Sequence, residues 1–168
     1  EISLPDMPPA TKETLVKVMV VEDNAELRQF ICEILSGTYR VVGVADGVMA
    51  LEEIEEEVPD FIITDIMMPR MDGIELIRHI KENVNTCDIP IIILSAKSSV
   101  EDRIQGLQLG IDDHILKPFS SDYLKSRIEN LIRQRKVLQS AFLSKYGAQP
   151  KKEPLEAIAY PVSQIVPL

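Results

Sequence analysis

The chain has 168 residues, 45% of them hydrophobic, which is enough for one packed domain with short tails and excludes wholesale disorder. Its net charge of −9 argues against a protein that binds nucleic acid over its whole surface. The two cysteines are too few for a disulfide scaffold and favour a reducing compartment. No apolar run reaches the roughly 18 residues that span a bilayer, so we expect no membrane insertion.

Short apolar runs alternate with helical patterns along most of the chain. The runs predict five buried strands, at residues 17–21, 39–44, 60–64, 89–94 and 113–116. Amphipathic spacing predicts five helices, namely one after the cap residue Asn24, one over 47–57, one around 74–80, one from Ser98 or Ser99 to Leu109, and a long one after Ser120. Because strand and helix alternate five times, we expect a doubly wound α/β fold with a five-stranded parallel sheet and helices on both faces.

Polar side chains follow four of the predicted strands at the point where each strand ends. They are Glu22 and Asp23 after the first strand, Asp65 after the third, Ser95 after the fourth and Lys117 after the fifth. Open α/β sheets bind ligands at this edge, so we expect these side chains to meet. Crowded carboxylates call for a cation, and their oxygen ligands favour Mg²⁺. The added hydroxyl and ammonium groups favour a phosphoryl group, with Asp65 as the nucleophile, although each residue alone would more often be a cap, turn former or solvated charge.

The sequence resembles the receiver domain of two-component response regulators over about residues 16–137. Four motifs carry the resemblance in the family's order and spacing, namely VVEDN at 20–24, TDIMMPRMDG at 64–73, LSA at 94–96 and KPF at 117–119. Gly110 and the Asp112-Asp113 pair add to it. The resemblance implies a flavodoxin-like receiver fold with strand order 2-1-3-4-5.

The resemblance also implies a phosphoacceptor site that uses Mg²⁺. Asp65 is expected to accept a phosphoryl group from a phosphohistidine on a sensor histidine kinase. Asp23 and Asp65 are expected to bind Mg²⁺ directly and Glu22 through water, with the backbone carbonyl of Met67 as the third protein ligand. Positioning and charge neutralisation would suffice for this transfer, so we expect self-catalysed phosphotransfer and autodephosphorylation and no enzymatic turnover of an outside substrate.

The same resemblance implies a switch. Ser95 is expected to bond a phosphoryl oxygen and Lys117 to pair with it, while Ala96 stays small so that the donor can approach. Phosphorylation would draw Ser95 toward Asp65 and change a surface made by the fourth helix, fifth strand and fifth helix. His114 stands where the family usually has Tyr or Phe. We therefore expect a weakened or pH-sensitive coupling, because imidazole can titrate near neutrality.

Two loop residues bear on the lifetime of the phosphorylated state. Met67 lies two residues after Asp65, and Lys97 lies two residues after Ser95. In the family the side chains at these positions flank the attacking water. A long apolar side chain at Met67 would crowd that water, so we expect slow self-dephosphorylation.

The last predicted helix continues beyond what a receiver domain needs. Its apolar residues keep a heptad spacing with one polar member, at Leu124, Ile128, Leu131, Arg135, Leu138 and Phe142. Residues 125–152 are strongly basic, whereas residues 1–124 are acidic. We expect a linker at 1–15, the receiver domain at 16–137, and a helix end and linker at 138–168. The last segment resembles the connection to an AraC-type DNA-binding output domain in hybrid two-component sensors.

Two other functions fit the sequence less well than a phosphoacceptor switch. A Mg²⁺-dependent aspartyl-phosphate phosphatase typically has a second Asp two residues after the first, where this chain has Met67. An interaction-only pseudo-receiver would be expected to lose an acid or the lysine, and this chain keeps all of them. We expect as partners a sensor histidine kinase and a second copy of this chain, through the switch surface or the extended helix. We expect no direct binding of nucleic acid, and a location in the cytoplasm or on the cytoplasmic side of a membrane-anchored hybrid sensor.

Overall fold

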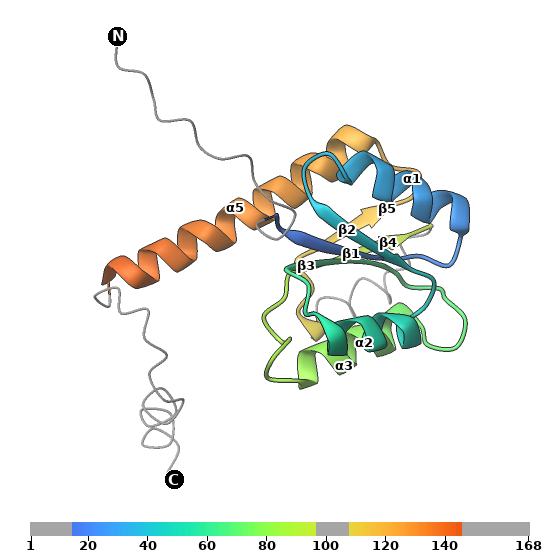
Figure 1. Ribbon diagram of the computed structural model, residues 1–168, viewed down its shortest axis with the longest axis horizontal. Coiled ribbons are helices and arrows are strands. Elements are labelled where there is room, and N and C mark those ends of the chain that lie inside the picture. The colour runs from blue at the N-terminus through green and yellow to red at the C-terminus, as the bar shows by residue number, and fades with distance from the viewer. Residues whose placement is uncertain (1–14, 97–107, 146–168) are drawn as a thin grey trace. The chain divides into compact units, whose positions relative to one another are not determined.

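The structure is a computed structural model that describes residues 15–96 and 108–145 (Figure 1). In these ranges the elements follow one another as β1 (Lys17–Val21), α1 (Ala25–Leu35), β2 (Arg40–Val44), α2 (Gly47–Glu56), β3 (Phe61–Asp65), α3 (Gly73–Glu82), β4 (Ile91–Ser95), β5 (Asp113–Leu116) and α5 (Ser121–Lys145). All neighbouring strands pair in parallel, in the order β2-β1-β3-β4-β5. The predicted fold class and strand order are confirmed.

Helices cover both faces of the sheet, and each face has its own apolar core (Figure 1). Successive strand side chains point to opposite faces. Met19 and Val21 therefore pack with residues of α2 and α3, whereas Val18 and Val20 pack with residues of α1 and the first part of α5. Strands that are covered on both faces have almost no polar residues in their interiors, which explains the continuous apolar runs of the sequence.

Most element boundaries agree with the sequence prediction to within one or two residues. β4 begins at Ile91, two residues later than predicted, because Pro90 has no N–H to donate to the ladder; its carbonyl still accepts from the Ile62 N–H at 3.0 Å. The helix predicted from Ser98 or Ser99 lies almost entirely outside the described residues. Its predicted stop, Gly110, has φ +84°, a left-handed conformation that glycine adopts without strain.

Side-chain caps begin the helices of the described chain. The predicted caps Asn24 and Ser120 accept hydrogen bonds from the N–H groups of Leu27 at 3.0 Å and Tyr123 at 3.1 Å. Two further caps, Asp46 for α2 and Asp72 for α3, were not predicted. All four caps follow strand ends or loops on the side of the sheet where the candidate site lies, so they also help to fix its loops.

Lys17 is buried at the start of β1 and makes ion pairs with α2. Its Nζ lies 3.2 Å from Glu53 Oε1 and 3.3 Å from Glu57 Oε2. The glutamates near the end of α2 are therefore partners for a buried lysine. A buried ammonium group needs such partners to offset its desolvation.

Internal contacts divide the chain into two units, Glu1–Ile132 and Arg133–Leu168. The structure describes residues 133–145 of the second unit, which are the C-terminal part of α5. The seam residues Leu138 and Phe142 are 70% and 62% exposed there. None of the described helices has the length and apolar character of a membrane span.

Candidate functional site

Asp65 ends the central strand β3, and two donors hold its carboxylate. Oδ1 accepts a hydrogen bond from the Ile66 N–H at 2.7 Å, and Oδ2 accepts one from Nζ of Lys117 at 3.0 Å. Only 7% of the residue is exposed. The orientation of this carboxylate is thus fixed before any substrate arrives, which favours its use as a nucleophile.

Glu22 and Asp23 follow β1 and bring two more carboxylates to Asp65. One oxygen from each of the three residues lies within 4.8 Å of the others. Glu22 is 2% exposed, and its Oε2 has no hydrogen-bond partner in the part of the chain that the structure describes. Burial, and then the neighbouring Asp65 carboxyl, raise the pKa of Glu22 to about 7, although Lys117 acts in the opposite direction. A buried carboxylate oxygen without a donor, next to two further carboxylates, fits a hard divalent cation that takes oxygen ligands.

Lys117 follows β5 and links two of these acids. Its Nζ donates to Glu22 Oε1 and to Asp65 Oδ2, both at 3.0 Å. Burial acts to lower the pKa of this ammonium group, but the hydrogen bonds to Glu22 and Asp65 outweigh it and hold the pKa above its ordinary value. The lysine therefore supplies a lasting positive charge, which reduces the repulsion among the carboxylates and can also bind a further anion.

Ser95 ends β4 and lies at the same edge of the sheet. Its Oγ is 2.9 Å from Nε2 of His114 in β5, which is within hydrogen-bond distance. Ser95 is 5% exposed, so its hydroxyl group is largely shielded from water. The arrangement brings together an oriented carboxylate, a candidate cation site, an ammonium group and a hydroxyl group, and these are the groups that phosphoryl transfer to a carboxylate requires.

Comparison with known proteins agrees with this chemistry. A family model described as the response regulator receiver domain matches residues 18–129. The chain belongs to this family. Its acidic pocket, serine and lysine thus lie in a receiver domain of the two-component signalling type.

Two curated relatives illustrate where such receiver domains occur. Hybrid signal transduction histidine kinase D of Dictyostelium discoideum is 44% identical over 122 residues, which are 73% of this chain and 8% of that protein. The phosphate regulon transcriptional regulatory protein PhoB of Escherichia coli (strain K12) is 39% identical over 119 residues, which are 70% of this chain and 52% of that protein. The chain therefore spans a small part of the kinase and about half of PhoB.

Solved structures of receiver domains are also similar to this chain. The signal receiver domain of a signal transduction histidine kinase from Syntrophus aciditrophicus is 32% identical, with a TM-score of 0.67, and the match covers 71% of this chain and 91% of that one. The chemotaxis protein CheY4 of Vibrio cholerae is 29% identical, with a TM-score of 0.66, over 69% of this chain and 98% of that one. Both similarities agree with the parallel sheet and its strand order.

The β3–α3 loop of the receiver domain is packed closely against Asp65. The Gly73 N–H donates to the Ile66 carbonyl at 2.8 Å, and a Cβ on Gly73 would lie only 2.0 Å from the Asp65 carbonyl oxygen. Any larger residue would push this loop away from the site. Arg70 ties the same loop to α2, because its Nε donates to Asp46 Oδ2 at 2.8 Å.

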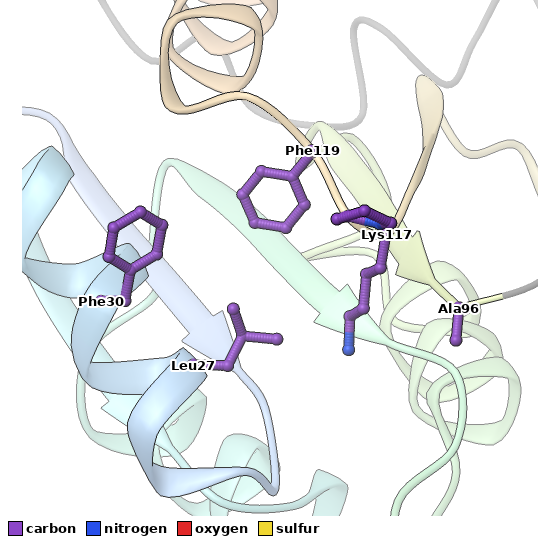
Figure 2. Close-up of a pocket in the computed structure, with 6 residues that line it drawn as sticks. Leu27, Phe30, Ala96, Lys117 and Phe119 are labelled. Carbon is purple, nitrogen blue, oxygen red and sulfur yellow. The ribbon is translucent and has the colours of Figure 1, made fainter.

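An apolar pocket of about 490 Å³ opens beside Lys117 (Figure 2). Leu27 and Phe30 of α1 line one side and Phe119 lies on the other, with Ala96 at the end near the lysine. Pro118 also lines the pocket. The exposed fraction of Phe30 is 45%, which is high for an aromatic side chain. A partner that reaches Lys117 from this side would find an apolar surface to pack on.

The structure brings together the carboxylates of Glu22, Asp23 and Asp65 with Lys117, and it joins Ser95 to His114. The side chain of Met67 is 78% exposed. Lys97 lies outside the described residues.

Sequence reasoning missed Asp46 and Arg70, although an acid two residues after the end of the second strand was a usable signal. It also missed the Ser95–His114 hydrogen bond, for which both residues were already candidates. The roles assigned to the individual site residues stay predictions.

Proposed function

We propose that this receiver domain accepts a phosphoryl group on Asp65 from the phosphohistidine of a sensor histidine kinase. The observation that carries the proposal is the fixed carboxylate of Asp65, held between the Ile66 N–H and Lys117 beside the buried Glu22. A carboxylate that only capped a helix or formed a turn would not need a partly buried lysine and two further acids around it.

In the proposed reaction an Asp65 oxygen attacks phosphorus, and the bond between phosphorus and the imidazole nitrogen of the donor breaks. The electron pair of that bond stays on the nitrogen, which takes up a proton and leaves as a neutral imidazole. Lys117 then pairs with a phosphoryl oxygen, and the hydroxyl of Ser95 donates to another. These groups orient and neutralise the phosphoryl group, so the receiver domain promotes its own phosphorylation and autodephosphorylation and turns over no other substrate.

Mg²⁺ is the cofactor that the acidic pocket fits. Asp23, Asp65 and the Met67 carbonyl are the proposed direct ligands, and Glu22 is proposed to act through water. When bound, a divalent cation neutralises charge on the phosphoryl oxygens. Glu22 Oε2, which has no hydrogen-bond partner among the described residues, and the mutual closeness of the three carboxylates support this assignment.

The apolar pocket beside Lys117 offers a surface for the phosphoryl donor. Ala96 and Lys117 line it together (Figure 2). Because Lys117 Nζ lies 3.0 Å from Asp65 Oδ2, a donor packed on Phe30 and Phe119 would lie near the attacking carboxylate. The small side chain of Ala96 leaves that approach open.

We further propose that phosphorylation changes the surface expected from the predicted fourth helix, which lies almost entirely outside the described residues, together with β5 and α5, and so controls a downstream output. The output is proposed to be transcriptional, as the name of PhoB says of that relative. Residues 16–137 are the proposed receiver domain, and a homodimer through this surface or through the C-terminal part of α5 is the proposed active form. A histidine kinase takes its phosphoryl group from ATP, so the proposed location is the cytoplasm, either free or on the inner side of a membrane-anchored sensor.

The experiment is to incubate the protein with acetyl phosphate and Mg²⁺ and to measure its intact mass. We expect a species heavier by about 80 Da, the mass of one phosphoryl group. Asp65→Asn should abolish it, while Asp122→Asn, which removes an exposed carboxylate in the first turn of α5, should not. A parent protein that gains no mass, or an Asp65→Asn variant that gains as much as the parent, would contradict the proposal.

A further inference from the structure

The strand register explains how His114 reaches Ser95. β4 and β5 pair in parallel, with Ile93 opposite His114 and Ser95 opposite Leu116. Ile93 and Ser95 lie two residues apart and face the same side of the sheet, as does His114. The imidazole therefore extends along the strand direction to the hydroxyl group, which gives the 2.9 Å distance between Oγ and Nε2.

The hydrogens in this contact can be counted. A serine hydroxyl has one hydrogen to donate, and a neutral imidazole carries its hydrogen on only one of its two nitrogens. If Nε2 accepts a hydrogen bond from Ser95 Oγ, the only hydroxyl hydrogen of Ser95 points toward His114. The hydroxyl oxygen then presents only lone pairs to the site. If Nε2–H donates, the hydroxyl hydrogen of Ser95 is available to another acceptor.

A phosphoryl group on Asp65 decides between the two arrangements, because its ionised oxygens only accept hydrogen bonds. Ser95 can bind such an oxygen only as a donor, and it keeps its contact with His114 only if Nε2 carries the hydrogen. We infer that His114 is a positioning residue, whose Nε2–H donates to Ser95 Oγ and holds the serine hydroxyl as a donor to the phosphoryl group. This inference rests on the proposed phosphorylation of Asp65.

The backbone around His114 is anchored in a way that suits this role. The His114 N–H donates to Asp113 Oδ1 at 2.8 Å, and Arg127 Nε of α5 donates to Asp113 Oδ2 at 2.5 Å. The imidazole therefore extends from a strand that is tied both to β4 and to α5. A positioning group needs such support, since a mobile imidazole would not fix the orientation of the Ser95 hydroxyl group.

Two neutral substitutions separate the proposed role from general packing. In His114→Gln the amide nitrogen can occupy the place of Nε2 and donate to Ser95. In His114→Asn the side chain is one carbon shorter, and its amide nitrogen corresponds to Nδ1. We expect the Gln variant to be phosphorylated by acetyl phosphate at nearly the parent rate, and the Asn variant to be slower by about tenfold, the effect of one lost hydrogen bond.

A second measurement reads the hydrogen position directly. The ¹⁵N shifts of the His114 ring in the parent protein, recorded before and after phosphorylation, report which nitrogen is protonated. We expect Nε2 to be protonated in the phosphorylated state. This measurement uses the parent protein and does not depend on the folding of either variant. For the rate comparison, the thermal midpoints of the unphosphorylated variants show whether both variants are folded.

The outcomes distinguish this inference from the proposed function. A parent protein that gains no phosphoryl mass would overturn both. A phosphorylated parent with an unprotonated Nε2, or a folded His114→Asn variant that reacts as fast as the parent, would overturn the role of His114 alone. A folded Gln variant as slow as the Asn variant would also overturn it, because the amide nitrogen would then fail to replace Nε2.

Discussion

Asp46 and Arg70 form an ion pair with 2.7 Å between Oδ2 and Nη2, and this pair joins the start of α2 to the loop that follows Asp65. Asp46 also caps α2 by accepting from the Met49 N–H at 2.9 Å. Arg70 has a positive φ of 64°, which is uncommon for a residue with a side chain and is held by its surroundings. One buried carboxylate thus stabilises a helix terminus and a loop of the site together.

The two roles of Asp46 can be separated by substitution. Asp46→Asn keeps a good cap but removes the ion pair, which is half exposed at Arg70, so we expect a loss of about 0.5 to 1 kcal/mol in unfolding free energy near neutral pH. Asp46→Ala removes both and should cost about 1 to 2 kcal/mol. Urea unfolding measures both values. Equal losses in the two variants would contradict the separate roles.

The contribution of the Asp46 charge should depend on pH. Burial acts to raise the pKa of this carboxyl, but the Met49 N–H and the Arg70 guanidinium group outweigh it and hold the pKa below its ordinary value. The stabilisation is therefore fully present above the ordinary aspartate pKa and is lost as pH falls through the lower, folded-state pKa. The parent and Asp46→Asn should differ in stability at neutral pH and converge in strong acid. If the difference in unfolding free energy between the parent and Asp46→Asn grew on acidification, the Asp46 charge would not stabilise the folded protein as predicted.

Gly73 is predicted to tolerate no side chain. A Cβ there would lie 2.0 Å from the Asp65 carbonyl oxygen, which is backbone and cannot move aside without displacing the site. Gly73→Ala should destabilise the fold by about 3 kcal/mol or more and slow phosphorylation by acetyl phosphate. Gly37→Ala is the matched control, because nothing lies within 4 Å of its added Cβ, and it should change the unfolding free energy by about 0.5 kcal/mol or less. Similar losses at both glycines would contradict the prediction.

Sequence reasoning predicted the sheet and the strand-end residues because both follow from local patterns. A buried parallel strand is a continuous apolar run, and the polar residue after each run must lie at the carboxyl edge of the sheet. Ser95–His114 and Asp46–Arg70 depend instead on strand register and on the path of a loop with a positive φ at Arg70. Periodicity carries no information on either feature. Lys17 was assigned to the first strand, but the ion pairs of its buried side chain with Glu53 and Glu57 depend on the three-dimensional packing.

Mg²⁺ is expected to stabilise the folded receiver domain. Three carboxylates with oxygens within 4.8 Å repel one another, and a bound divalent cation removes that repulsion. At a Mg²⁺ concentration about one hundred times Kd, the gain should be about 2.7 kcal/mol, measurable as a rise in the thermal midpoint. Glu22→Gln and Asp65→Asn should weaken the effect, whereas Glu26→Gln, which changes an acid in the first turn of α1 outside the cluster, should not. A rise that all three variants share would point to a general salt effect.

Met67 is expected to prolong the phosphorylated state. Its side chain is 78% exposed, so it is available to restrict the approach of water to a phosphoryl group on Asp65. Met67→Ala should shorten the half-life several-fold, as measured by the decay of the phosphorylated mass after the donor is removed. Met49→Ala, at an exposed methionine of α2, should leave the half-life unchanged. A parent half-life of only seconds in Mg²⁺, or equal decay in Met67→Ala and the parent, would contradict the prediction.

Leu138 is predicted to contribute to a dimer through the C-terminal part of α5. It continues the heptad seam and is 70% exposed, so Leu138→Glu should leave the fold intact and weaken self-association by about tenfold or more. Val137 is 60% exposed but lies outside the seam, which makes Val137→Glu a control with the same change of charge on the same helix. Sedimentation of each protein, with and without acetyl phosphate, measures the effect. The seam would be excluded as the interface if the parent stayed monomeric in both states, or if the two variants dissociated equally, because the added charge alone would then account for the change.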